Sequence, residues 1–283
     1  MRNYAGVEGS WNSYEKAQIL LQSIPYDGTS TWGKGADKGF EAFMDATDNM
    51  ELYDIETQSE VYRRGVHILD SITESASPEA LFKAVYDSTK FLLNTDKFLS
   101  YFGGEHSISI GVIKAFYEKY SNLTVLQLDA HADLRPSYHG SPYNHACALY
   151  DASRNCNLVQ VGIRSMDIEE KQYIQSGNCF FAHEMYGHNR WMQESIERMT
   201  EDVYLTIDLD AFDPSILAAT GTPEPGGLSW YDTLNYLRQV FKSKNVVGFD
   251  IVELAPEVGQ KASSFLAAKL YYKLLSYKFE DGQ

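Results

Sequence analysis

The stretch LTVLQLDAHADLR, residues 123–135, joins an apolar run to three ionisable side chains at every second position. Residues 123–128 predict a buried strand, because the run is short and almost continuously apolar. Asp129, His131 and Asp133 follow it directly. An unpaired carboxylate buried at such a place costs several kcal/mol or takes up a proton. The stretch therefore predicts a strand whose end needs a compensating positive charge.

Outward from this stretch, the chain alternates short apolar runs with amphipathic helical patterns. Alternation of this kind predicts parallel strands joined by crossover helices, and the apolarity of the runs predicts a sheet covered on both faces. No linker, repeat or low-complexity tract interrupts the series, so we expect a single α/β/α domain over residues 1–283. Strands are expected at 17–24, 98–102, 123–128, 157–163, 203–209 and 245–252, and helices near 78–93, 107–120, 189–199, 229–242 and 261–275.

The composition is that of a globular protein with an acidic surface. Of the 283 residues, 44% are hydrophobic and 22% are charged. Thirty-nine acidic against 24 basic residues give a formal charge of −15, which disfavours nucleic acid or an anionic membrane as a partner and favours a cationic substrate. Three cysteines without a CxxC pair, no leader peptide and no long apolar run predict a cytoplasmic protein.

Charged residues follow three further predicted strands. His106 comes after 98–102, Asp208 and Asp210 end the strand 203–209 with Asp213 beyond, and Glu253 follows 245–252. Two segments without clear periodicity, roughly 25–60 and 210–228, also follow strands, and the loops at the carboxyl ends of parallel strands build the sites of such folds. Period-two spacing in extended backbone is expected to place Asp129, His131 and Asp133 on one side, and to do the same for Asp208 and Asp210.

The residue types at these strand ends indicate a metal site. Two imidazoles and four carboxylates suit borderline-to-hard divalent ions, and they suffice for two ions that share bridging carboxylates. Such a centre activates a water as the nucleophile, so no serine or cysteine is required. A calcium loop is excluded because Phe212 stands where an Asp or Asn ligand belongs.

The segment GTSTWGKG, residues 28–35, nearly spells a phosphate-binding loop after a strand. Gly35 occupies the position where the magnesium-binding Ser or Thr belongs, which argues against nucleotide binding.

Six motifs together resemble the signatures of the ureohydrolases, the arginase and agmatinase family, with agmatinase the closer match. The likeness spans about residues 20–270 and implies a three-layer α/β/α fold with a mostly parallel sheet of about eight strands. It also places the loop 28–35 beside the guanidinium pocket. The motifs are IPYDGTSTWGKGADKGFEAF (24–43), GGEHS (103–107), DAHAD (129–133), DLDAFDP (208–214), GTPEPGGL (221–228) and DIVELAP (250–256).

The resemblance implies two Mn²⁺ ions that serve the hydrolysis of a guanidinium group to urea and an amine. Glu253 is expected to receive the guanidinium, because a carboxylate accepts two parallel N–H bonds from that planar cation. Thr222 and Glu224, in the Pro/Gly loop 221–228, are expected to face the substrate. Carried over motif by motif, His106 and Asp133 hold one ion, His131 and Asp210 hold the other, and Asp129 and Asp208 bridge them.

The departing amine needs a proton, which a histidine near the site can deliver. In the family this shuttle follows the third motif residue, here Asp133, by about a dozen positions. Two candidates stand in YHGSPYNHA, residues 138–146. We predict His145 from its spacing; His139 is the alternative, because it is followed by glycine as the family shuttle often is.

Agmatine, cleaved to putrescine and urea, is the expected substrate, because the segment 135–146 does not match the Ser/Asn-rich stretch with which arginases hold the amino-acid end of arginine. A guanidino-acid hydrolase is the close alternative, since Arg135 and Arg164 could bind a carboxylate. An arginase or a catalytically silent metal-binding relative is less favoured. A two-metal phosphoesterase is disfavoured because Glu253 would repel phosphate. The family also implies a homotrimer or homohexamer.

Overall fold

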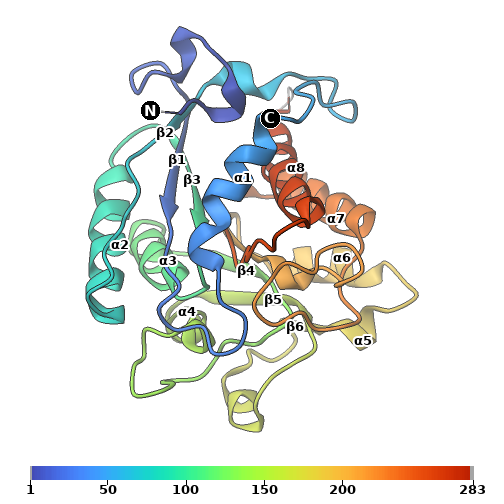
Figure 1. Cartoon of the computed structure of the whole chain (residues 1–283). Helices are drawn as coiled ribbons and strands as arrows, with labels where there is room; N and C mark the ends of the chain where they lie inside the picture. The colour runs from blue at the N-terminus through green and yellow to red at the C-terminus, as the bar shows by residue number, and fades with distance from the viewer. Residues whose placement is uncertain (1, 281–283) are drawn as a thin grey trace.

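The computed structural model describes residues 2–280 and is built around one sheet of parallel strands (Figure 1). The strand order across the sheet is β2-β1-β3-β8-β7-β4-β5-β6. The strands are β1 Ile19–Ile24, β2 Val66–Ile68, β3 Phe98–Gly103, β4 Thr124–Leu128, β5 Asn157–Ile163, β6 Cys179–Phe181, β7 Asp202–Asp208 and β8 Asn245–Val252, and every neighbouring pair is parallel. The predicted parallel α/β sheet is confirmed.

Helices cover both faces of the sheet, which gives three layers (Figure 1). One face packs against α2 (Pro78–Leu92), α3 (Ile108–Lys119) and α4 (Tyr150–Asn155). The other packs against α1 (Gly39–Thr47), α6 (Arg190–Glu197), α7 (Trp230–Ser243) and α8 (Lys261–Lys278), with the short α5 (Ala182–Met185) beside them. Among residues 2–280, no helix has both the length and the hydropathy that crossing a bilayer requires.

The apolar runs form strands that are buried on both faces. In β4, Val125 packs in the core on the α2–α4 side, whereas its neighbour Leu126 packs in the core on the α1–α8 side. Successive side chains of a strand point to opposite faces, so a two-sided sheet needs apolar residues at every position rather than at alternate ones. This is why the strands could be predicted from continuous runs.

Five α-helices and β-strands among residues 2–280 were not predicted: the short helices α1, α4 and α5 and the edge strands β2 and β6. Helix α1 lies inside the segment 25–60, which we had described as lacking periodicity. It has nine residues and is held by packing against α8, so its short local pattern carries little signal. The edge strands β2 and β6 have three residues each, and their side chains are mostly half-buried.

The sheet order brings the predicted strand ends together. Strands β3, β8, β7 and β4 are consecutive in the sheet, although they are far apart in the sequence. Because all four are parallel, their carboxyl ends lie at the same edge. His106, Glu253, Asp208 and Asp129 follow or end these four strands, so the fold gathers them at its centre.

Candidate metal centre and catalytic cavity

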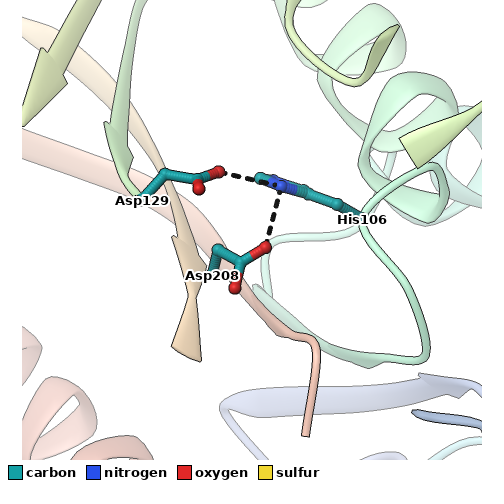
Figure 2. Close-up of side chains that lie close together, drawn as sticks. All are labelled: His106, Asp129 and Asp208. Atoms are coloured by element: carbon teal, nitrogen blue, oxygen red, sulfur yellow. Dashed lines mark ion pairs between the residues drawn. The ribbon is translucent and has the colours of Figure 1, made fainter. Parts of the chain in front are cut away.

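His106 lies at the centre of a cluster of aspartates (Figure 2). Its Nδ1 is 3.1 Å from Asp129 Oδ2, 3.1 Å from Asp133 Oδ2 and 3.3 Å from Asp208 Oδ2. All four residues are buried. Three carboxylate oxygens therefore surround a single nitrogen atom that water does not reach.

The opposite edge of the His106 ring determines which nitrogen carries a hydrogen. Thr206 donates its only hydroxyl hydrogen to Asp250 Oδ1 at 2.6 Å, and its oxygen lies 3.0 Å from His106 Nε2. A hydroxyl that already donates must accept here, so Nε2 is the N–H donor. Asp250 is fixed in turn by the Tyr204 hydroxyl at 2.6 Å. In a neutral ring, Nδ1 then presents a lone pair to three carboxylates.

A lone pair facing carboxylates is repulsive unless a positive charge stands between them. Without a metal, a proton must fill that role: burial lowers the pKa of His106, but the hydrogen bonds to the three aspartates outweigh burial and raise the pKa well above its usual value. A divalent ion satisfies the same four atoms directly, and imidazole with carboxylates is a ligand set suited to such ions. The donor set therefore fits a bound metal.

A second group of candidate ligands lies beside the first. Asp210 Oδ2 is 2.9 Å from His131 Nδ1, and Asp129 Oδ1 is 3.7 Å from the same nitrogen. Asp129 belongs to both groups, His106–Asp129–Asp208 and Asp129–His131–Asp210. One carboxylate can thus contribute an oxygen to each of two sites. The structure brings all six predicted ligands together, and their roles as metal ligands stay a prediction.

The backbone reaches this arrangement differently from the prediction. Strand β4 ends at Leu128, Asp133 has a φ of 52°, and Asp210 lies in a short 3₁₀ turn, so neither motif is extended throughout. The expectation of period-two geometry was wrong. Asp129 Oδ1 accepts the N–H of His131 at 2.6 Å, and Asp208 Oδ1 accepts that of Asp210 at 2.9 Å. Asp side chains favour turns of this kind two residues on, and these turns fold the ligands inward.

The cluster carries more negative charge than its surroundings can compensate. Burial and neighbouring carboxylates raise the pKa values of Asp208 and Glu253 well above the usual range, and burial with the Asp129 charge raises the pKa of Asp133 to about 7. Each raised pKa means that the ionised form is unfavourable in this place. The fold therefore holds Asp133, Asp208 and Glu253 where added positive charge would favour their anionic forms. For Asp129, burial alone would raise the pKa, but the hydrogen bonds to His106 and His131 outweigh burial and lower it.

A cavity of about 290 Å³ opens beside the cluster. Its walls include five of the six predicted ligands, all but Asp129, and three other predicted site residues, His145, Thr222 and Glu253. Glu224 is not among the lining residues; its Oε1 lies 3.9 Å from His131 Nε2. The lining residues are Thr31, His106, His131, Ala132, Asp133, Arg135, Tyr138, His145, Ala146, Ser165, Met166, Asp167, Glu170, Asp208, Asp210, Thr222 and Glu253.

Glu253 is presented to the cavity by an unusual backbone conformation. Its φ is +66°, a left-handed value that is uncommon for residues other than glycine. Its N–H donates to the Gly104 carbonyl at 2.9 Å, and its Oε1 accepts the N–H of His106 at 2.8 Å. Such strain at a residue beside a cavity is typical of functional sites. The carboxylate is thus tied to the same loop that carries the metal-ligand candidate His106.

Of the two candidate shuttles, only His145 lines the cavity. His139 is exposed on the loop and does not line the cavity. Burial, together with the charges of His106 and His131, lowers the pKa of His145 to about 4. The ring is therefore uncharged at neutral pH.

Arg164 and Arg135, the two candidates for binding the carboxylate of a guanidino acid, differ in their contacts. Arg164 donates to backbone carbonyls around it, including Asp210 O at 2.7 Å and Glu224 O at 2.8 Å, so it fastens the loop after β7 rather than facing a substrate. Arg135 lines the cavity, but it pairs with Asp167 at 3.2 Å and lies over the Tyr138 ring.

Several residues that support the site were not predicted for it. Thr206 and Asp250 orient His106, and Gln127 donates to Asp129 Oδ2 at 2.7 Å. The available signal was a polar residue inside an apolar strand, because a buried polar group needs a specific partner. Glu105 accepts hydrogen bonds from Thr29 and Ser107.

Comparison with known proteins agrees with this arrangement. The Arginase family profile matches residues 17–276. An N(1)-aminopropylagmatine ureohydrolase from Synechocystis sp. is 38% identical, with 94% of this chain and 90% of that protein covered. An agmatinase from Pyrococcus horikoshii is 29% identical over 92% and 91% of the two chains. The crystal structure of the agmatine ureohydrolase of Thermoplasma volcanium superposes with a TM-score of 0.87 at 27% identity, covering 98% of this chain and 94% of that one.

Proposed function

The chain belongs to the arginase family and is a ureohydrolase of that family; from this premise we propose that it uses two Mn²⁺ ions to hydrolyse a guanidine with a cationic tail to urea and an amine. The observation that carries the proposal is His106 Nδ1 facing three carboxylates beside a cavity that Glu253 also lines. The cluster of carboxylates favours bound cations, and the nearby carboxylate of Glu253 favours a cationic group on the substrate.

Two manganese ions held by the six ligand candidates would supply Lewis-acid activation of a water molecule as the nucleophile. Glu253 binds the guanidinium through paired N–H···O bonds and so fixes its central carbon in the cavity. His145 is uncharged at neutral pH, accepts a proton in the cavity and returns it to the departing amine nitrogen. Thr222 lies on the cavity wall, where it can contact the same substrate.

Two features support a tail that is itself cationic. The relatives are named for agmatine and for its N(1)-aminopropyl derivative, and both carry an amine at the end away from the guanidine. The chain carries a formal charge of −15, and Glu170 lines the cavity. We therefore propose agmatine, converted to putrescine and urea, and N(1)-aminopropylagmatine as the two candidate substrates.

A guanidino-acid hydrolase is a second candidate, because Arg135 lines the cavity. Its guanidinium is already paired with Asp167 and lies over Tyr138, which leaves it less able to bind a substrate carboxylate.

Urea release by the manganese-loaded protein tests the proposal. Agmatine, N(1)-aminopropylagmatine, arginine, guanidinobutyrate and guanidinopropionate are compared by kcat/KM, with Glu253→Gln as the inactive control. We expect one of the two amine-tailed guanidines to be the best substrate. A higher kcat/KM with a guanidino acid would favour the second candidate, a guanidino-acid hydrolase. No urea from any compound would indicate a catalytically silent relative.

A further inference from the structure

Thr29, in the loop after β1, touches the shuttle candidate His145 and the buried carboxylate of Glu105 at once. Its Oγ1 is 2.8 Å from Glu105 Oε1, 3.1 Å from His145 Nδ1 and 3.0 Å from the backbone nitrogen of His145. The three residues come from three separate segments: the loop after β1, the turn between β3 and α3, and the short 3₁₀ helix His145–Cys147. One hydroxyl thus joins the loop 25–35, the end of β3 and the segment that carries His145.

The hydrogens at this hydroxyl can be assigned by counting donors. Glu105 also accepts the N–H of Thr29 at 3.2 Å and the N–H of Ser107 at 2.8 Å, both of which can only donate. The Ser107 hydroxyl also donates to Oε1, at 2.9 Å, so an ionised carboxylate that already accepts from three donors also accepts the Thr29 hydroxyl hydrogen. Thr29 Oγ1 is then left with lone pairs, and both nitrogens of His145 that approach it must donate.

We propose that Thr29 is a positioning residue that fixes the tautomer of His145, with its hydrogen on Nδ1 and the lone pair of Nε2 left for proton exchange in the cavity. This inference rests on the proposed function, because it gives Thr29 a role in the proton transfer assigned to His145. The chain Glu105–Thr29–His145 orients the ring by the same logic by which Asp250–Thr206 orients His106. In each chain, a hydroxyl donates its hydrogen to a buried carboxylate, and its oxygen therefore accepts a hydrogen from an imidazole nitrogen.

The backbone is shaped to bring these groups together. Gly104 approaches the loop after β1 so closely that a Cβ on it would lie 1.8 Å from the Tyr26 carbonyl oxygen. The N–H of Gly104 donates to Ile24 O at 2.7 Å, and that of Glu105 donates to Tyr26 O at 2.8 Å. This contact holds Glu105 against the segment that carries Thr29. A side chain at 104 would separate the two.

Neutron diffraction from deuterium-exchanged crystals of the manganese-loaded, full-length protein tests the assignment without any variant. We expect deuterium on His145 Nδ1, none on Nε2 at neutral pH, and the Thr29 deuterium directed at Glu105 Oε1. Deuterium on Nε2 alone, with the Thr29 deuterium directed at Nδ1, would overturn the inference. Either result leaves the proposed hydrolase activity untouched.

Kinetics of Thr29→Val and Thr29→Ser supply the second measurement. Valine keeps the shape but removes the hydroxyl, so kcat should fall roughly 10- to 100-fold with KM unchanged, because proton transfer is lost and guanidine binding is not. Serine keeps the hydroxyl and should restore most of kcat. Thr57→Val, which removes a hydroxyl bonded to Ser59 in a loop that does not line the cavity, is the matched control and should keep full activity.

His145→Ala separates failure of the inference from failure of the proposed function. A His145→Ala enzyme with low kcat beside an undiminished Thr29→Val enzyme contradicts the role of Thr29 alone. Full activity in His145→Ala contradicts the shuttle itself. Manganese content is measured in each variant. A Thr29→Val protein could lose metal and still show, in its neutron structure, the His145 hydrogen on Nδ1. That result would make Thr29 a structural residue and overturn the inference.

Discussion

At the scale of single residues, the chemistry of the site depends on which polar atoms carry a hydrogen and which present a lone pair. Thr206 forces the lone pair of His106 toward the aspartates, and Thr29 leaves the lone pair of His145 free in the same way. In the sequence, Thr206 is marked only as a polar residue inside an apolar strand, and Thr29 carries no comparable signal. Both become visible once the structure shows that the hydroxyl donates to a buried carboxylate, because it must then accept from the imidazole.

Glu253→Gln separates substrate binding from metal binding. The amide keeps the shape of the side chain but can no longer accept two parallel bonds from a guanidinium. We expect kcat/KM to fall at least about 100-fold while the manganese content stays that of the unaltered protein. Loss of metal in this variant would mean that Glu253 serves the metal centre instead of the substrate.

His145→Ala and His139→Ala form a matched pair. His145 lines the cavity and His139 lies exposed on the neighbouring loop, so only the first substitution should reduce kcat, by roughly 10²-fold or more. Steady-state urea release measures both. The opposite ranking would assign the shuttle to His139.

At the scale of elements, the segment 209–228 carries the ligand candidate Asp210 and the cavity-lining Thr222 without long regular structure. Asp213 holds it together: Oδ2 accepts the N–H groups of Gly226 at 2.9 Å and Gly227 at 3.2 Å, and Oδ1 accepts that of Ser215 at 3.0 Å. Arg164 fastens the same segment from the side of β5. The loop is therefore ordered by single polar side chains that bind its backbone.

The substitution Asp213→Asn should remove the pH-dependent part of the stability that residue 213 gives to the fold. Hydrogen bonds from Ser215 and from the backbone N–H groups lower the pKa of Asp213 to about 2, below the value of about 3.9 that an unfolded chain has. A depressed acid pKa stabilises the fold above the unfolded value, and the stabilisation is lost as pH falls from about 4 to about 2. Urea unfolding at neutral pH and in acid should show a stability difference between the two proteins that shrinks with acidity. A difference that does not change with pH would contradict this account.

At the scale of the whole molecule, much of the fold was readable from the sequence because the sheet is buried on both faces. Continuous runs such as 157–163 and 245–252 matched β5 and β8 to the residue. The three-residue edge strands and the short helices α1, α4 and α5 were missed, because they depend on neighbours rather than on local pattern.

For the site, sequence located the six ligand candidates, His145 and Glu253 at the right edge of the sheet, since parallel strands end together. It misjudged their backbone, because turns at Asp129 and Asp208 replace extended chain. It also missed Thr29 and Thr206, whose roles depend on contacts far apart in the sequence. The homotrimer or homohexamer that the resemblance implies stays a prediction.

Metal should stabilise the whole fold, because the charge of the cluster is uncompensated without it. A ligand that binds only the folded chain adds about 2.7 kcal/mol at a free concentration one hundred times its Kd. Chelation should therefore lower the unfolding temperature, and manganese should restore it. Asp129→Ala, which removes the carboxylate shared by both ligand groups, should abolish this response. An unfolding temperature that does not change on chelation would count against a metal centre.

The most direct measurement is anomalous diffraction at the manganese absorption edge from crystals of the manganese-loaded protein. The account predicts two manganese peaks per chain inside the cluster, one bonded to His106 Nδ1 and one to His131 Nδ1, with Asp129 contacting both. Absence of peaks in the cluster, or aspartate side chains turned away from one another around a vacant centre, would contradict it.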